Sequence, residues 1–118
     1  MLQSFWKQSW IDITERGKMR RREMSYEDYG MTDAEVRYIK EFCRNAKDED
    51  KALIRNALVQ IPTDIAPYVY YSLINKISYD EMCKKRYIYI SKGDFYGHRR
   101  YAINQIKKMM ISHNLWKI

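Results

Sequence analysis

Apolar residues recur at helical spacing along most of the chain, and capping residues stand where these stripes begin. Thr32-Asp33-Ala34-Glu35 is a capping box, so it predicts a helix that starts there and stops near Asn45. Asp48-Glu49-Asp50 places acid at the start of a second helix, which Pro62 ends or follows as a turn. Thr63 is suited to cap a third helix.

The C-terminal third contains two more helix starts. Ser78-Tyr79-Asp80-Glu81 is a second capping box, and the short helix that it opens is closed by Lys84-Lys85-Arg86. Tyr87-Ile88-Tyr89-Ile90 is the one strand-like run, which indicates a short strand or an extended turn. Ser91-Lys92-Gly93-Asp94 begins a long helix that reaches about Ser112. Its apolar stripe consists of Phe95, Ala102, Ile103, Ile106, Met109 and Met110.

The N-terminal part gives a weaker signal. A first helix is predicted over residues 3–22, because Phe5, Trp6, Trp10 and Ile13 fall at helical spacing, although Gly17 is unfavourable inside a helix. Residues 23–31 have the composition of a linker or turn. The pattern as a whole predicts an all-α protein of five or six helices. The predicted protein has an aromatic and basic segment over residues 1–31 and one helical domain over residues 32–118.

Charge is distributed unevenly. The chain has 118 residues, the size of one domain, with 22 basic and 15 acidic residues and a net charge of +7. Residues 91–118 hold six basic residues and one acidic residue, a sum of +5. This skew favours a local nucleic-acid footprint over a generally basic surface.

The sequence gives little support for catalysis, metal binding or membrane insertion. Cys43 and Cys83 fall at apolar positions, which favours buried thiols in a cytoplasmic protein, with one disulfide between them left open. His98 and His113 form no zinc-type spacing with the cysteines, and no catalytic motif occurs, so we expect no enzyme, metal or cofactor. The chain shows no apolar run long enough to span a membrane and no signal-peptide pattern at its N-terminus.

Residues 78–112 have the order of a helix-turn-helix: a short capped helix, a turn and a longer capped helix. Such proteins place the second helix in the major groove of DNA. The polar side of this helix is expected to be free, with Gly93 and Gly97 letting a backbone approach closely. Arginine can bind guanine, asparagine adenine and lysine phosphate. The candidate DNA-binding residues are Lys92, Tyr96, His98, Arg99, Arg100 and Asn104.

Two short segments carry a resemblance. Residues 77–82 together with residues 90–96 resemble the helix-turn-helix of region 4 of bacterial sigma factors, a module also found in small phage late-gene activators. Ser91 matches the capping serine of that pattern, Phe95 its buried apolar residue and Ala102 its small inner residue.

The resemblance implies a transcriptional regulator from a phage or mobile element, with promoter DNA and RNA polymerase as partners. It places Tyr96-Gly97-His98-Arg99-Arg100-Tyr101 at the positions that meet DNA. The sequence departs from the pattern in two ways. The spacing from Ser78 to Ser91 is longer, and Tyr87-Ile88-Tyr89 replaces the usual glycine of the turn.

Other interpretations stay open. The basic helix face is either a DNA reader, a solvated face or a surface for an acidic protein partner. The run Arg20-Arg21-Arg22 is either an arm for a minor groove or a solvated helix end. The eleven tyrosines suit either stacking on the bases of single-stranded DNA or RNA, or packing at the edge of the core. Phe5, Trp6 and Trp10 either anchor a homodimer or cover the protein's own core.

Overall fold

The computed structural model describes residues 20–118, and this part of the chain is all-α. Five α-helices and two short 3₁₀-helices make up its regular structure, without any strand among these residues. The 3₁₀-helices are η2 (Arg21–Glu23) and η3 (Glu27–Tyr29). The α-helices are α1 (Asp33–Arg44), α2 (Asp48–Ala57), α3 (Ala66–Asn75), α4 (Tyr79–Cys83) and α5 (Lys92–Ser112). The expected all-helical class is confirmed.

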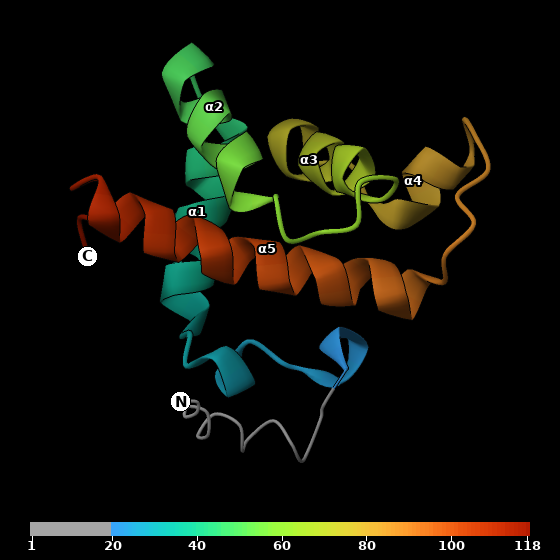
Figure 1. Cartoon of the computed structure of the whole chain (residues 1–118), viewed down its shortest axis with the longest axis horizontal. Helices are drawn as coiled ribbons and strands as arrows, with labels where there is room; N and C mark the ends of the chain where they lie inside the picture. Colours follow the sequence, from blue (N-terminus) through green and yellow to red (C-terminus); the bar gives the residue numbers. More distant parts are fainter. Residues whose placement is uncertain (1–19) are drawn as a thin grey trace, which may run out of the picture.

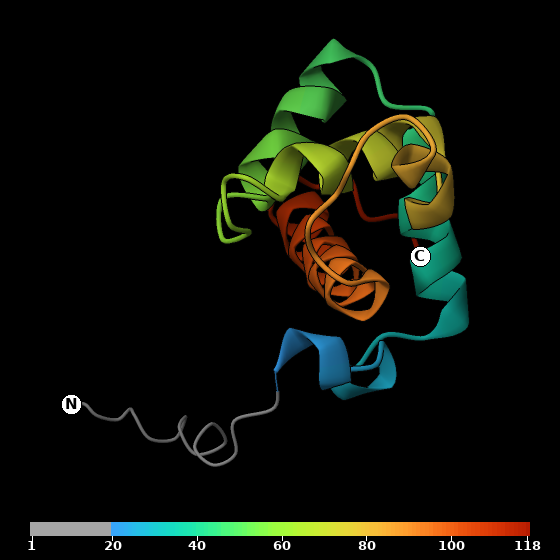
Figure 2. The same cartoon turned by 90° about the vertical axis from the view of Figure 1, so that its right-hand side faces the viewer.

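Helix α5 lies in the middle of the molecule. Figures 1 and 2 show α2 and α3 on one side of it and η2 on the other, while α1 crosses α5, and α5 contacts all four elements. Phe95, Ala102 and Ile106 form one buried side of α5. Gly97 is also buried, although the helical repeat places it on the opposite side. A helix that is buried on two sides is a central core element.

The core joins all these helices. Its fully buried side chains include Ile39 from α1, Ile54 from α2, Val69 from α3, and Phe95 and Ile103 from α5. Burying a side chain of this size contributes about 1.5–3 kcal/mol to folding. Met31 and, in part, Tyr26 and Tyr29 also belong to this cluster, so the linker ahead of α1 packs on the helices.

Three helix starts lie where their capping residues predict them. Glu35 N–H donates to Thr32 Oγ1 at 3.1 Å, and Thr32 N–H donates back to Glu35 Oε1 at 3.0 Å. Ser78 and Glu81 repeat this box at the start of α4, with distances of 3.1 and 3.0 Å. Ser91 Oγ accepts the amide of the third residue of α5 at 3.1 Å.

Other boundaries differ from the prediction. Helix α2 ends at Ala57, well before Pro62, and α3 begins after Ile65 rather than at Thr63. The residues between them turn inward because Ile61 and Ile65 are both buried, and Ile65 N–H donates to Pro62 O at 2.9 Å. The turn is therefore what buries both isoleucines, which a straight extension of α2 or α3 would not do.

The C-terminal connection also differs. Helix α4 ends at Cys83, so Lys84–Arg86 follow the helix instead of closing it. Residues 87–90 form an irregular connection to α5, which corrects the option of a short strand. Both cysteines are free, which excludes the disulfide, and Cys83 is exposed while Cys43 is buried. Burial raises the pKa of Cys43 to about 12.

Several expectations fall on residues 1–19, which lie outside the described part. They are most of the helix predicted over 3–22 and the homodimer anchor at Phe5, Trp6 and Trp10. The end of the predicted helix is described, and there Arg21–Glu23 form a 3₁₀-turn instead of an α-helix. Within residues 20–118 no helix combines the length and the apolar character needed to span a membrane.

Candidate nucleic-acid interface

The polar side of α5 is crossed by the backbone of η2. A Cβ atom added at Gly97 would lie only 2.6 Å from both the Cα and the N of Arg22. This contact requires glycine, because no side chain fits between the two backbones. The close approach expected at Gly97 is present, and the backbone that approaches is the protein's own.

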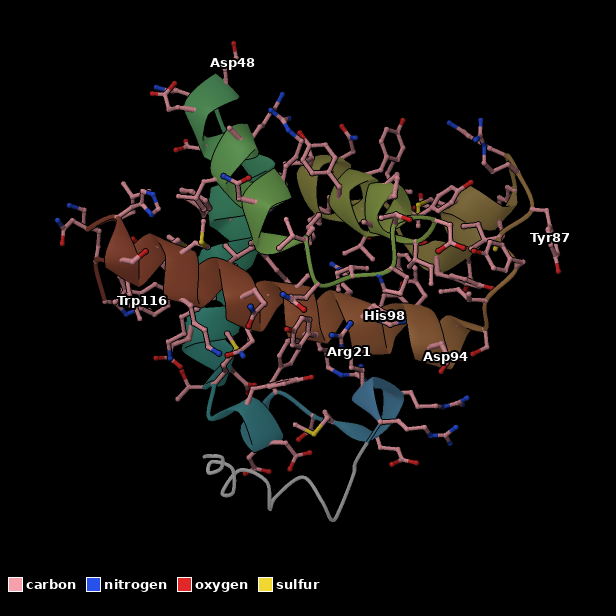
Figure 3. All side chains as sticks on the ribbon, viewed as in Figure 1. Arg21, Asp48, Tyr87, Asp94, His98 and Trp116 are labelled. Atoms are coloured by element: carbon pink, nitrogen blue, oxygen red, sulfur yellow. The ribbon has the colours of Figure 1, made fainter. Side chains whose placement is uncertain are left out.

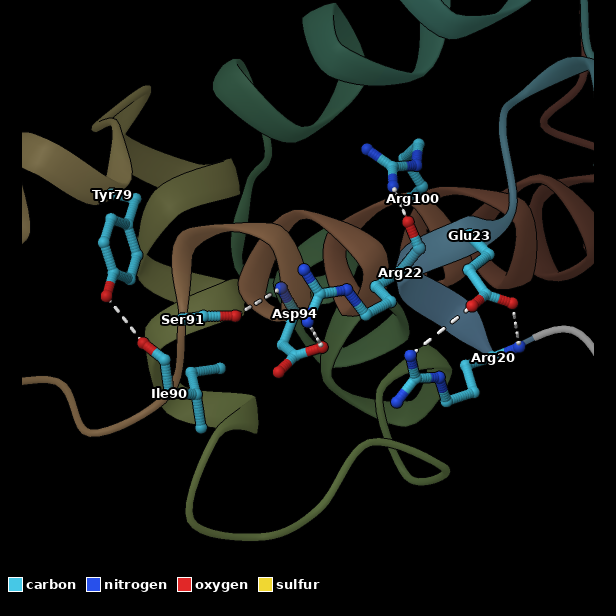
Figure 4. A network of polar contacts seen from close by, with 8 residues as sticks. All are labelled: Arg20, Arg22, Glu23, Tyr79, Ile90, Ser91, Asp94 and Arg100. Atoms are coloured by element: carbon cyan, nitrogen blue, oxygen red, sulfur yellow. Dashed lines mark hydrogen bonds and ion pairs between the residues drawn. The ribbon is translucent and has the colours of Figure 1, made fainter.

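Arg100 fixes the same crossing. Its Nε donates to Met24 O at 2.7 Å, and its Nη2 donates to Arg22 O at 3.3 Å, as Figure 4 shows for the second bond. Both acceptors are backbone carbonyls of the segment that lies across α5. Arg100 is therefore occupied in the folded chain by holding residues 22–24 in place.

Arg21 points into the protein from η2, toward α5. Its Nη1 donates to Gln60 O at 3.1 Å, and its guanidinium lies 3.8 Å from the centroid of the Tyr101 ring. Nη1 is also 3.3 Å from Nδ1 of His98, and Figure 3 shows the two side chains close together. Because a guanidinium has only donors, the imidazole nitrogen accepts there.

This environment keeps His98 neutral. Burial lowers its pKa from the ordinary value of 6.5, and the positive charge of Arg21 lowers it further, while Asp94 partly opposes them. A neutral histidine that accepts from a neighbouring arginine supports the crossing of η2 over α5. It is not a free cation for phosphate.

Arg22 has a different position from its neighbour. Its Nη1 lies 3.4 Å from Oδ1 of Asp94, near the start of α5, and both side chains are about 40% exposed. Its guanidinium also lies over Gly93. An exposed pair of this kind contributes at most ~1 kcal/mol. The three arginines therefore differ: Arg21 is held inside and Arg22 lies beside the first turn of α5, so neither is a free arm. Arg20 is solvated and paired with Glu23 at the start of η2.

The remaining candidate residues do not form one free face. Tyr96 is half-buried, and its hydroxyl accepts the N–H of Tyr79 at 3.0 Å. Arg99 and Asn104 are also partly buried, and Arg99 faces a cavity beside α1 and α3. Lys92 alone is exposed, with its Nζ 2.9 Å from Oδ2 of Asp80. The expectation of a free polar face is therefore corrected: the described N-terminal segment covers part of it, and the fold itself takes up more.

Tyr79 joins α4 to α5, a role that the apolar pattern did not indicate. Its hydroxyl donates to Ile90 O at 2.6 Å, and its ring centroid lies 5.5 Å from that of Phe95. Of the residues expected between these helices, Met82 and Phe95 are buried, whereas Cys83 is exposed. The sequence signal that could have indicated this contact is the position of Tyr79, directly after the capping Ser78.

The first turn of α5 is left open to solvent. Ser91, Lys92 and Gly93 are exposed, and Lys92 reaches Asp80, which precedes Lys84 by one helical turn. Lys84, Lys85 and Arg86 are exposed and form no ion pair within residues 20–118. Tyr87 is at the tip of the same connection (Figure 3). We call this region the α5 N-terminal surface; its cations are Arg22, Lys84, Lys85, Arg86 and Lys92.

Acidic groups reduce the charge of this surface without cancelling it. Asp80, Glu81 and Asp94 lie among the five cations. The pKa of Glu81 is lowered by its hydrogen bonds from Ser78 and, more weakly, by the charges of Lys84 and Lys85. The carboxylate is therefore ionised, and the surface has an excess of two positive charges at neutral pH.

Comparison with protein-family models, with curated proteins and with solved structures gave no match to this chain. Nor does the described part bring together three or more His, Cys, Asp or Glu side chains in a group able to hold a metal ion.

Proposed function

We propose that the protein binds duplex DNA through the α5 N-terminal surface. The observation that carries the proposal is that Ser91–Gly93 at the start of α5 remain exposed, with Lys92 in the first turn and Arg22 beside it. Lys84, Lys85 and Arg86 are exposed on the connection that leads to this turn, while η2 covers part of the side of the helix. Backbone N–H groups at a helix N-terminus favour phosphate, and lysines and arginines displace counterions from the DNA backbone.

In this arrangement the duplex meets the end of α5 and not its length. Lys92 is then the one predicted contact that keeps its assigned role directly. Arg22 supplies the DNA contact that was expected from an N-terminal arm, because η2 holds this residue beside Gly93. Arg100 and His98 act on binding only by keeping η2 in position.

The resemblance to sigma region 4 leads us to propose promoter DNA as the target and RNA polymerase as the protein partner. The free thiols Cys43 and Cys83 suit the reducing cytoplasm in which such a regulator acts. Both parts of the proposal depend on duplex binding, so duplex binding is tested first.

The test compares two triple variants of equal charge. Lys84→Ala/Lys85→Ala/Arg86→Ala removes three cations from the α5 N-terminal surface. The control, made at three exposed lysines elsewhere, is Lys47→Ala/Lys108→Ala/Lys117→Ala. Fluorescence anisotropy with a labelled duplex is measured over a salt series.

We expect the surface variant to bind the duplex ~10-fold or more weakly and to show a shallower salt slope, by about 0.9 for each phosphate that the variant no longer neutralises. The control should stay close to the wild type. Equal decreases in affinity in the two variants would mean that net charge alone drives binding, and the proposed surface would then be wrong.

Exposed tyrosines favour a second candidate function, binding of single-stranded DNA or RNA. Tyr71, Tyr87 and Tyr89 are 48%, 83% and 54% exposed. A cavity of about 630 Å³ is lined by Tyr68, Tyr71, Lys85 and Arg86, among others. Stacking of a base on such a ring contributes ~1–3 kcal/mol. Loss of single-strand binding in Tyr71→Ala/Tyr87→Ala, with duplex binding unchanged, identifies this function.

A further inference from the structure

A second charged region lies away from the α5 N-terminal surface. A cavity of about 600 Å³, open to solvent, is lined by residues of α1, α3 and α5, by Lys76 after α3 and by the end of the described chain. Tyr38, Leu73 and Ile118 are part of its wall. Its charged lining consists of Arg37, Lys40, Glu41, Arg44, Lys76 and Arg99. This volume is in the range of sites for small organic ligands.

The lining has five cations and one carboxylate. Glu41 is already paired, since its Oε2 lies 2.6 Å from Nη2 of Arg44. Arg37, Lys40, Lys76 and Arg99 form no ion pair with any residue of the described range. Four positive charges from three helices therefore converge on one cavity without a counter-charge from the protein.

Arg99 is the most unusual member of this group. Its Nε is buried and lacks a hydrogen-bond partner among residues 20–118. The pKa of the neighbouring Lys40 is lowered by burial and then by the charge of Arg99. Buried polar groups nearly always have a partner, so the unpaired Nε of Arg99, beside a second cation, is a donor that an anion in the cavity would satisfy.

Lys76 adds an independent observation. It ends α3 with φ of 54° and ψ of 49°, the left-handed conformation in which glycine is usual. A lysine at this position accepts backbone strain that glycine would avoid. It also brings a cation to the cavity from the end of α3, whereas Arg37 and Lys40 come from α1.

The opposite wall is suited to an apolar group. The Tyr38 hydroxyl donates to Leu115 O at 3.4 Å, and the Tyr38 ring meets the Trp116 ring edge-on at a centroid distance of 5.3 Å. These contacts hold the C-terminal residues against α1, and thereby close the side of the cavity that Ile118 lines.

We propose that this cavity binds a small phosphorylated ligand, with Arg99 and Lys40 on the phosphate, Arg37 and Lys76 around it, and Tyr38 and Leu73 against the organic part. A phosphate accepts several charge-assisted hydrogen bonds at once, and a guanidinium matches its oxygens in pairs. A chloride ion or a single carboxylate has too little charge to engage four cations, and citrate spreads its charge over three separate carboxylates, none of which offers the clustered oxygens of a phosphate.

The experiment is isothermal titration calorimetry of the whole chain, without DNA, using pyrophosphate and AMP as probes and citrate as a carboxylate probe. We expect saturable binding of the phosphate probes at one site per chain, with citrate clearly weaker. Arg99→Gln and Lys76→Gly should each weaken phosphate binding by ~10-fold or more. Lys47→Met, at an exposed lysine outside the cavity, should leave it unchanged.

Lys76→Gly keeps the test decisive if Arg99→Gln does not fold, because glycine suits the left-handed position and removes the charge without strain. No heat of binding with either phosphate probe overturns the proposal. Equal affinity for the wild type and Lys76→Gly also overturns it, and so does citrate binding as tightly as AMP. None of these outcomes depends on DNA binding at the other surface.

Discussion

The backbone of Arg22 crosses α5 at Gly97 so closely that a Cβ at residue 97 would lie 2.6 Å from the Arg22 Cα. This contact joins two segments that are far apart in the sequence. The contact determines which parts of α5 a partner can reach. The side under η2 is covered, whereas the first turn is accessible.

Gly97→Ala should therefore destabilise the protein. The added methyl group meets fixed backbone, so η2 must move away from α5, at a cost of ~1–3 kcal/mol. Urea unfolding followed by circular dichroism gives the change. Gly93→Ala is the matched control: there the new Cβ meets the far end of the flexible Arg22 side chain at 3.0 Å, and alanine favours the helix. A loss of stability as large at Gly93 as at Gly97 contradicts the crossing.

Arg100→Ala should release the same segment. It removes two hydrogen bonds to the carbonyls of Met24 and Arg22 and leaves those oxygens in need of other partners. The expected loss is ~1–3 kcal/mol in the free energy of unfolding. Limited proteolysis should then cut near residues 20–26 faster than in the wild type. Unchanged stability and unchanged cleavage would show that Arg100 is free for DNA, as the sequence pattern predicted.

The pH dependence of stability should contain a contribution from His98. Its pKa is lowered in the folded state, so the unfolded chain takes up the proton first as pH falls. The contribution is fully present above pH 6.5, the ordinary value, and is lost as pH falls from there toward the folded pKa. In His98→Gln the unfolding free energy should vary less between pH 7.5 and pH 5. A wild type and variant with parallel curves would contradict the assignment.

The two thiols should differ in reactivity. Cys83 is exposed, whereas Cys43 is buried with its pKa raised to about 12, so little thiolate forms there. Titration with a thiol reagent at pH 8 should modify Cys83 rapidly and Cys43 only after denaturant is added. Cys83→Ser serves as the control and should show no fast phase. Rapid modification in Cys83→Ser would mean that α1 is not packed as described.

Local features were predictable from the sequence. The starts at Thr32, Ser78 and Ser91 follow from a capping side chain and an amide three residues away, and all three are present. Helix ends were less predictable, because the turn that buries Ile61 and Ile65 depends on the core that receives them.

The covering of α5 could not be predicted from helical periodicity. It depends on Arg100 reaching a carbonyl 76 residues earlier in the chain, and a backbone carbonyl leaves no sequence signal. Gly97 was the one available sign, since it permits a close backbone approach without saying whose backbone approaches. The basic residues Arg99 and Arg100 looked alike in the pattern, yet one faces a cavity and the other binds η2.

The most direct measurement is an NMR titration of the ¹⁵N-labelled protein with a short duplex. If DNA meets the α5 N-terminal surface, the largest amide shifts should fall at Ser91–Gly93 and Lys84–Tyr87. Asn104 and the amides of residues 21–24 should then shift little, because η2 stays on α5. Shifts concentrated along Tyr96–Asn104, with residues 21–24 released, would contradict the proposed surface and restore the whole length of α5 as the reading element.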